Sequence, residues 1–140
     1  MGRKGAGRQS YGVTSNTRAL DVRVVVADDS APFRRSLGAF LATVPGVRVV
    51  GEAADAEEAV TVAAETKPDI VLLDLVMPKG GGVSAAYRIK RDTNARVILL
   101  SLLGQRELAL ATRAAGADGF VCKADIDTRL VDALELGKPD

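Results

Sequence analysis

The sequence VRVVVADD, residues 22–29, joins a valine-rich run to two adjacent carboxylates. A run dominated by β-branched residues is typical of a strand that is buried on both faces of a sheet. Four further short segments are predicted strands, namely residues 47–50, 70–73, 97–100 and 118–122. A polar residue follows most of these strands, as the aspartates follow the first one.

Segments with helical spacing separate the predicted strands. After the first strand, apolar residues recur at helical spacing at Phe33, Leu37, Phe40, Leu41 and Val44. Residues 55–66 begin with Asp55 and Glu58 in the pattern of a capping box. Further helices are predicted over residues 83–91, 106–115 and from about 126 to the stop signals Gly137 and Pro139. Five strands alternating with five helices predict an α/β fold, a doubly wound parallel sheet with helices on both faces.

Length and composition fit one ordinary globular domain. The chain has 140 residues, of which 47% are hydrophobic and 26% charged. No apolar run reaches the length of a membrane span, and the first ten residues lack the apolar core of a secretory signal. We therefore expect no membrane association and a cytoplasmic location.

The charge is unevenly distributed along the chain. Residues 1–20 hold four basic side chains and no acidic one, whereas acidic residues outnumber basic ones in the remainder. A basic tail can contact nucleic acid or an acidic partner, but we interpret residues 1–20 as a flexible leader. The globular domain is predicted to cover residues 21–137.

Two residue counts exclude whole classes of chemistry. The sequence contains no histidine, which excludes a Ser-His-Asp triad, a Cys-His pair and a histidine-containing zinc site. The single cysteine, Cys122, cannot form an internal disulfide. We interpret Cys122 as a small buried hydrophobic residue of the last strand, without a redox role.

The polar residues at the strand ends are expected to converge. They are Asp28 and Asp29 after the first strand, Asp74 after the third, Ser101 after the fourth and Lys123 after the fifth. In doubly wound folds the functional site lies at the carboxyl ends of the strands. Three neighbouring carboxylates repel one another unless a cation intervenes, and an oxygen-only donor set without histidine favours Mg²⁺.

The same set of residues suits phosphoryl transfer. An aspartate carboxylate can act as a nucleophile and form an acyl phosphate, so Asp74 is the predicted phosphoacceptor. Mg²⁺, the Lys123 ammonium and the Ser101 hydroxyl can each bind one of the oxygens on which charge collects during transfer.

These residues resemble the response-regulator receiver family of two-component signalling. The resemblance covers about residues 22–136, and it rests on Asp28-Asp29, on Asp74-Leu75-Val76-Met77-Pro78 with Gly82, on Ser101, and on the segment AGADGFVCK at residues 115–123. It implies a flavodoxin-like sheet with strand order 2-1-3-4-5, and a receiver domain over residues 21–137.

The resemblance also implies roles for individual residues. Asp29, Asp74 and the main-chain carbonyl of Val76 would bind Mg²⁺ directly, and Asp28 would act mostly through water. Asp74 would receive its phosphoryl group from a sensor histidine kinase, with Lys123 and Ser101 binding the phosphoryl oxygens. Ser101 and Phe120 would form the switch that reports phosphorylation.

Three positions depart from the usual pattern of the family. Ala124 replaces the proline that commonly follows the lysine, a variation found in receivers with a helix-turn-helix output domain. Leu102 stands where a small residue is common and could narrow access to Asp74, and Phe120 lacks the hydroxyl of the more usual tyrosine.

Because no DNA-reading segment follows in this sequence, we expect no direct DNA binding by this chain. We expect output through a partner, through a homodimer formed on phosphorylation, or through a domain outside the chain.

Two other functions fit the residue pattern less well. A phosphatase or phosphotransferase with an aspartyl nucleophile usually has a second acid two residues later, where this sequence has Val76. A flavin-binding module would need a phosphate-binding loop after the first strand, where Asp28 and Asp29 would repel phosphate. A signalling switch that catalyses only its own phosphorylation and dephosphorylation fits these residues better.

Overall fold

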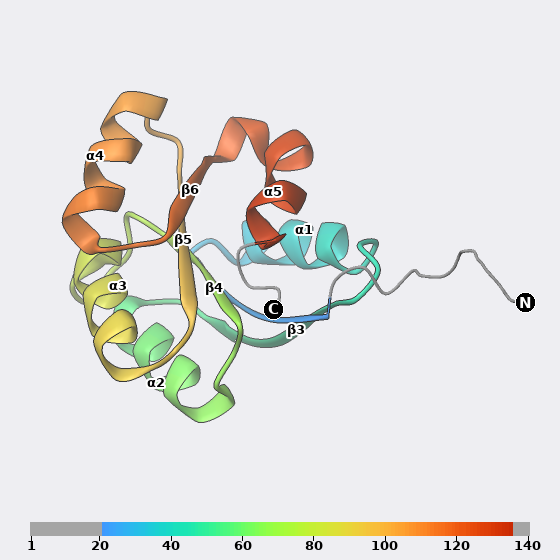
Figure 1. The fold of residues 1–140 in the computed structure, drawn as a ribbon, viewed down its shortest axis with the longest axis horizontal. Coiled ribbons are helices and arrows are strands. Elements are labelled where there is room, and N and C mark those ends of the chain that lie inside the picture. The colour runs from blue at the N-terminus through green and yellow to red at the C-terminus, as the bar shows by residue number, and fades with distance from the viewer. Residues whose placement is uncertain (1–20, 136–140) are drawn as a thin grey trace, which may run out of the picture.

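The computed structural model describes residues 21–135, which form one parallel sheet flanked by helices (Figure 1). The strands are β2 (Val22–Ala27), β3 (Val47–Ala53), β4 (Ile70–Asp74), β5 (Arg96–Ser101) and β6 (Gly119–Cys122). The helices are α1 (Ala31–Leu41), α2 (Ala56–Thr66), α3 (Gly81–Asp92), α4 (Gln105–Ala115) and α5 (Ile126–Leu134), with a short 3₁₀ turn, η2 (Lys123–Asp125), before α5. The order of the strands is β3-β2-β4-β5-β6, which confirms the predicted 2-1-3-4-5 arrangement.

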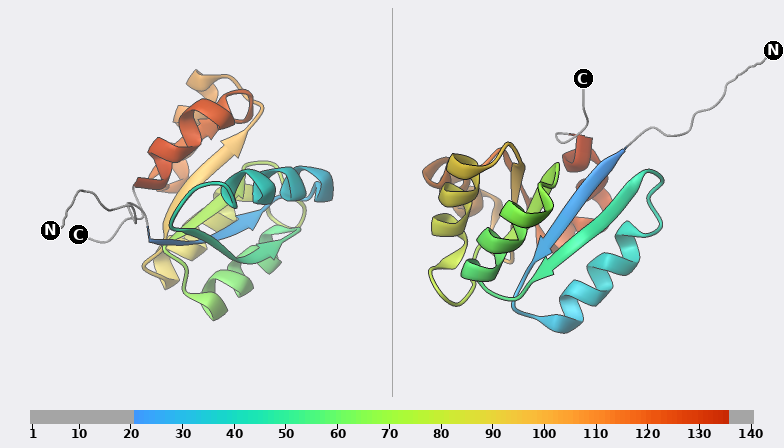
Figure 2. Two further views of the ribbon diagram at one scale, coloured as in Figure 1. Left: turned by 90° about the vertical axis from the view of Figure 1, so that its right-hand side faces the viewer. Right: turned by 90° about the horizontal axis from the view of Figure 1, so that it is seen from below.

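Helices cover both faces of the sheet (Figure 2). The sheet therefore separates two hydrophobic layers. On one face, Val24, Val26 and Leu72 pack with residues of α1 and α5. On the other face, Val25 and Leu73 pack with residues of α2, α3 and α4. Successive side chains of a strand point to opposite faces, so a strand buried on both sides must be apolar at nearly every position.

The direction in which the chain adds strands reverses at β2. From β2 the chain moves to β3 on one side, and then crosses to β4 on the other side. The register pairs Ala27 of β2 with Leu73 of β4, so the residues that follow, Asp28 and Asp74, lie at adjacent strand ends. This is the position at which doubly wound folds bind their ligands.

Two elements extend beyond a predicted bound by two or more residues. β3 continues to Ala53 rather than ending at residue 50, because its pairing with β2 resumes after a register shift. α3 begins at Gly81, two residues before the predicted start, and its N-cap Gly80 has a φ of 115°. Glycine has a low helix propensity, which hides this start from sequence, yet the left-handed cap requires it.

Gly82 permits a close approach between α3 and the end of β4. A Cβ atom at this position would lie 2.5 Å from the Asp74 carbonyl oxygen and 2.7 Å from Leu75 Cα. The Gly82 amide instead donates a hydrogen bond of 2.8 Å to the Leu75 carbonyl. Gly82 therefore fixes the loop that carries Asp74 against the first turn of α3.

Two sequence-based predictions concern the chain beyond the core. The predicted tail at residues 1–20 and the last two residues of the predicted 21–137 domain lie outside the described residues. Within residues 21–135, none of the helices combines the length and apolarity needed to cross a bilayer.

Candidate functional site

The buried polar side chains of the described residues gather in one place. Across residues 21–135 these are Asp28, Asp74 and Ser101, with exposed fractions of 0%, 6% and 3%. They lie at the carboxyl ends of β2, β4 and β5, as predicted from the sequence. Burial of polar groups is costly unless they have partners, so their interactions indicate what the site stabilises.

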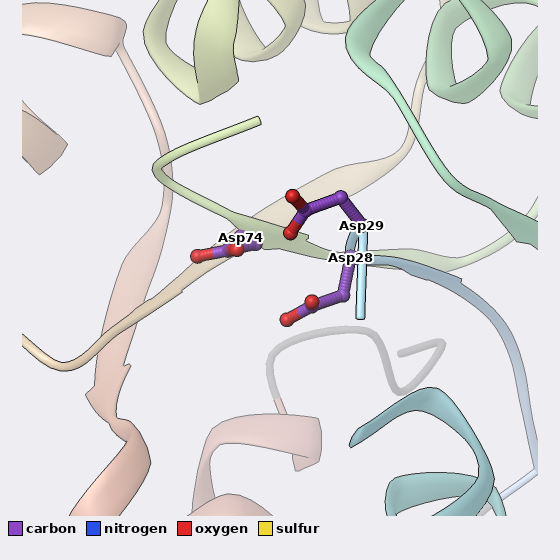
Figure 3. Close-up of side chains that lie close together, drawn as sticks. All are labelled: Asp28, Asp29 and Asp74. Carbon is purple, nitrogen blue, oxygen red and sulfur yellow. The ribbon is translucent and has the colours of Figure 1, made fainter. Parts of the chain in front are cut away.

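The three predicted carboxylates form a cluster. Asp28, Asp29 and Asp74 each offer a carboxylate oxygen, and these atoms lie within 4.8 Å of one another. Figure 3 shows the three side chains side by side, two following β2 and one at the end of β4. Asp29 is exposed whereas Asp28 is fully buried, so the cluster is open to solvent on the Asp29 side. An accessible, all-oxygen donor set of this kind fits a hard divalent cation such as Mg²⁺.

Lys123 is the cation of the site. Its Nζ lies 2.6 Å from Asp28 Oδ2 and 3.6 Å from Asp74 Oδ2, and its side chain is only 14% exposed. The ammonium also lies over the Phe33 ring, 4.1 Å from the centroid. Lys123 follows β6 directly, so the sheet brings it to Asp28 across 95 positions of sequence.

Asp28 is held by several groups besides Lys123. Its Oδ1 accepts a 2.8 Å hydrogen bond from the Ser30 amide, and Ser30 is itself the N-cap of α1. Arg34 donates a short hydrogen bond to the Asp28 carbonyl and pairs with Glu52 of β3 at 3.2 Å. Arg34 was not predicted as a site residue, because an arginine in the first turns of a helix has no motif that distinguishes it from a surface charge.

The environment of Asp74 disfavours its charged form. Burial raises the pKa of the Asp74 carboxyl above its ordinary value of 3.8, and the negative charge of Asp28 raises it further. The charge of Lys123 and the Val76 amide, whose nitrogen lies 3.4 Å from Asp74 Oδ1, act in the opposite direction. Burial and the neighbouring carboxylates thus disfavour the charged form of Asp74, and a bound cation would favour it.

Ser101 and Phe120 occupy the neighbouring strands β5 and β6. The Ser101 Oγ accepts a 3.1 Å hydrogen bond from the Leu103 amide, which ties the side chain to the β5–α4 loop. Phe120 is partly buried and packs against the core beneath α2, α3 and α4. Its strand partner is Leu99, two residues before Ser101, so both predicted switch residues lie close to the same stretch of β5.

The loops around the site carry apolar side chains at the surface. Val76 is 69% exposed, Leu102 84% and Leu103 41%. Val76 follows β4, and both leucines lie in the β5–α4 loop. The side chains of Val76, Leu102 and Leu103 themselves carry no group that could hydrogen-bond a water molecule.

The prediction for Cys122 needs a correction. Cys122 belongs to the last strand, as predicted, but it is half-buried rather than fully buried. It packs against the core that lies beneath α2, α3 and α4.

Comparison with known proteins identifies the class of this chain. Residues 24–135 match the model of the response regulator receiver domain. The chain therefore belongs to the response regulator receiver domain family of two-component systems, a family whose members work with histidine kinases and phosphatases. This match confirms the family predicted from the strand-end residues.

The curated relatives include both long and short proteins. The chain is 37% identical over 123 residues to the transcriptional regulatory protein PdtaR of Mycobacterium tuberculosis, covering 88% of this chain and 60% of PdtaR. It is 40% identical over 113 residues to the chemotaxis protein CheY of Thermotoga maritima, covering 80% of this chain and 93% of CheY. The chain thus spans less than two thirds of the length of PdtaR and nearly all of that CheY.

Solved structures support the same fold. The two-component response regulator of the LuxR family from Aurantimonas has a TM-score of 0.76 at 37% identity, covering 81% of this chain and 82% of that one. A chain of the CheX–CheY–BeF₃–Mg²⁺ complex from Borrelia burgdorferi has a TM-score of 0.69 at 32% identity, covering 81% of this chain and 90% of that one. Relatives of the LuxR family are consistent with the subfamily suggested by Ala124.

Proposed function

We propose that Asp74 is the phosphoacceptor of a signalling switch and receives its phosphoryl group from the phosphohistidine of a sensor histidine kinase. An Asp74 carboxylate oxygen forms a bond to phosphorus, and the phosphorus–nitrogen bond of the donor breaks with its electron pair returning to the imidazole. The observation that carries this proposal is a nearly buried carboxylate with an ammonium 3.6 Å away and two further carboxylates within 4.8 Å.

Lys123 and Ser101 are the proposed ligands of the phosphoryl oxygens. The Lys123 Nζ lies 3.6 Å from Asp74 Oδ2. It would therefore need little movement to reach an oxygen of a phosphoryl group bound to Asp74. The Leu103 amide occupies one acceptor position of the Ser101 Oγ, which leaves the hydroxyl proton available to donate. Both groups would stabilise the negative charge that develops on the phosphoryl oxygens during transfer.

The proposed metal ligands are Asp29, Asp74 and the main-chain carbonyl of Val76, with Asp28 acting through water. The exposure of Asp29 and the oxygen-only donor set support Mg²⁺, as does the presence of Mg²⁺ with BeF₃ in the related CheY complex. When bound, Mg²⁺ supplies positive charge that offsets both the carboxylate repulsion and the charge of the phosphoryl oxygens. Asp28 is better suited to hold Lys123, because it is fully buried and bonded to it.

In the proposed output, phosphorylation changes the shape of one face of the domain. Movement of Ser101 toward the phosphoryl group and an inward turn of Phe120 would alter the face formed by α4, β6 and α5. This face would then bind a partner, an output domain or a second copy of the chain in the cytoplasm. The name of PdtaR, a transcriptional regulatory protein, favours control of transcription, with DNA contacted by a part other than this chain.

The direct test is the intact mass of the protein after incubation with acetyl phosphate and Mg²⁺. We expect a gain of one phosphoryl group in the wild type, and none in Asp74→Asn or without the metal. A gain that persists in Asp74→Asn would refute the assignment of Asp74. A gain in Asp28→Asn that equals the wild type in rate would refute the proposed role of the buried Asp28–Lys123 pair.

A further inference from the structure

The ammonium of Lys123 has an aromatic neighbour that the family assignment does not explain. Lys123 Nζ lies 4.1 Å from the centroid of the Phe33 ring, while Asp28 Oδ2 and Asp74 Oδ2 lie 2.6 and 3.6 Å away. The ring face carries negative electrostatic potential and attracts a cation within about 6 Å. The attraction is largest where water is excluded, and the Lys123 side chain is only 14% exposed.

Lysine needs such a restraint more than other cations do. Its ammonium is a compact point charge at the end of a flexible four-carbon stem, with no planar geometry to fix its direction. Asp28 holds one side of it, and Asp28 is itself fixed by the Ser30 amide. Phe33 holds the ammonium from a different element, because Phe33 lies in the first turn of α1 and packs against the core beneath α1 and α5.

An alternative position for the ammonium exists beside the ring. Phe33 and Lys123 both line an open pocket of about 360 Å³ between α1 and the segment formed by η2 and α5. Asp127 lines the same pocket and offers a competing carboxylate. Without the ring, Lys123 would gain room to turn away from Asp74 toward Asp127.

We propose that Phe33 is a positioning residue that keeps the Lys123 ammonium directed at Asp28 and Asp74 rather than into the α1–α5 pocket. The inference rests on the proposed function of Asp74, since its consequence is faster phosphoryl uptake. Phe33 itself touches no reacting atom and acts only through Lys123. The aromatic ring, and not merely an apolar side chain, is required at this position.

The kinetic test compares substitutions that separate the ring from its volume. We expect Phe33→Leu to slow the uptake of phosphoryl from acetyl phosphate about threefold to tenfold, the size expected for a partly desolvated cation–ring contact. Phe33→Tyr keeps the ring and should retain the wild-type rate. Phe40→Leu is the matched control, because Phe40 lies on the same helix and lines the same pocket but is not the ring under Lys123. Its rate should equal that of the wild type.

A double variant tests the alternative position directly. If Asp127 attracts the released ammonium, Phe33→Leu combined with Asp127→Asn should recover part of the lost rate. Thermal unfolding of each variant separates a positioning effect from loss of the fold. Uptake by Phe33→Leu at the wild-type rate, or uptake by Phe33→Tyr as slow as that of Phe33→Leu, would overturn the proposal. A double variant as slow as Phe33→Leu would overturn the diversion toward Asp127.

A spectroscopic measurement tests the contact without any phosphorylation. Protons above an aromatic face experience the ring current, so the Lys123 ε-methylene protons should resonate upfield in the wild type and in Phe33→Tyr. They should return to ordinary lysine positions in Phe33→Leu and remain shifted in Phe40→Leu. Unshifted protons in the wild type would overturn the inference even if Asp74 is phosphorylated. Failure of the wild type to take up phosphoryl, with the shift present, would instead refute the proposed function.

Discussion

Replacing Asp74 with asparagine should stabilise the fold at neutral pH, because this removes a buried charge in a crowded acidic cluster. A carboxylate oxygen of Asp28 and one of Asp29 each lie within 4.8 Å of a carboxylate oxygen of Asp74. At an effective dielectric constant of about 20, this distance corresponds to a repulsion of about 3.5 kcal/mol between Asp74 and each neighbour. The attraction between Asp74 and the Lys123 ammonium, at 3.6 Å, is about 4.6 kcal/mol under the same assumption. The repulsion exceeds the attraction by about 2 kcal/mol; solvent screening of the exposed Asp29 reduces this excess, and desolvation adds to it.

We therefore expect Asp74→Asn to raise the free energy of unfolding by about 1–3 kcal/mol at pH 7 without metal. The sign of the pH dependence follows from the raised pKa of Asp74. Between the ordinary carboxyl value of 3.8 and the raised native pKa, the native protein holds a proton that the unfolded chain has lost, so wild-type stability falls as pH rises. The advantage of Asp74→Asn should therefore be absent below pH 3.8 and fully present above the native pKa.

The measurement is urea unfolding of both proteins in EDTA over a range of pH. Asp132→Asn is a suitable control, because Asp132 is exposed on α5 and its replacement should change stability by less than about 0.5 kcal/mol. Added Mg²⁺ should narrow the difference, since it stabilises the wild type through mass action. If Asp74→Asn is no more stable than the wild type at pH 7 in EDTA, the electrostatic account of the cluster is wrong.

Three further predictions follow from the site. Asp29→Ala should weaken Mg²⁺ binding by about tenfold or more in a metal titration, because two carboxylates are needed to offset dehydration of the ion; unchanged affinity would refute this. The acyl phosphate of Asp74 should decay slowly for a receiver, because Val76 and Leu103 cannot hydrogen-bond an attacking water, so Val76→Asn or Leu103→Glu should speed the loss of phosphate from the purified protein. Equal decay rates would show that these side chains do not govern water placement. Ser101→Ala should still accept phosphate but lose any phosphorylation-dependent change in solution size, and a retained change would exclude Ser101 from the switch.

The sequence was informative about the fold because its apolar residues follow two distinct patterns, continuous runs in the strands and helical spacing between them. Strands buried on both faces must be apolar throughout, and β2, β4 and β5 show this pattern plainly. The start of α3 was predicted wrongly because Gly80 and Gly81 act through their positive φ, which a propensity argument treats as a loop signal. β3 was predicted too short because its exposed edge position tolerates Gly51 and Glu52 within the strand.

The site was predictable only where residues follow directly from strand ends. Parallel strands bring their carboxyl ends to one edge, so Asp28, Asp74 and Lys123 converge whatever the details of packing. Phe33 and Arg34 lie on a helix, and their contacts depend on how α1 is rotated against the sheet. That rotation results from packing between residues distant in sequence and has no local signature.

The three aspartates differ in exposure, and this difference separates their tasks in the proposed function. Asp28 is fully buried and tolerates burial because Lys123 and the Ser30 amide both bond to it, so its charge is already satisfied inside the protein. Asp29 is exposed and follows it by one residue, so the same loop presents a carboxylate that a cation from solvent can reach. Asp74 lies between these two environments, and its raised pKa reflects a charge that neither Lys123 nor water fully compensates. In the proposed function we therefore expect Mg²⁺ to bind before phosphoryl transfer, because its positive charge would offset this imbalance.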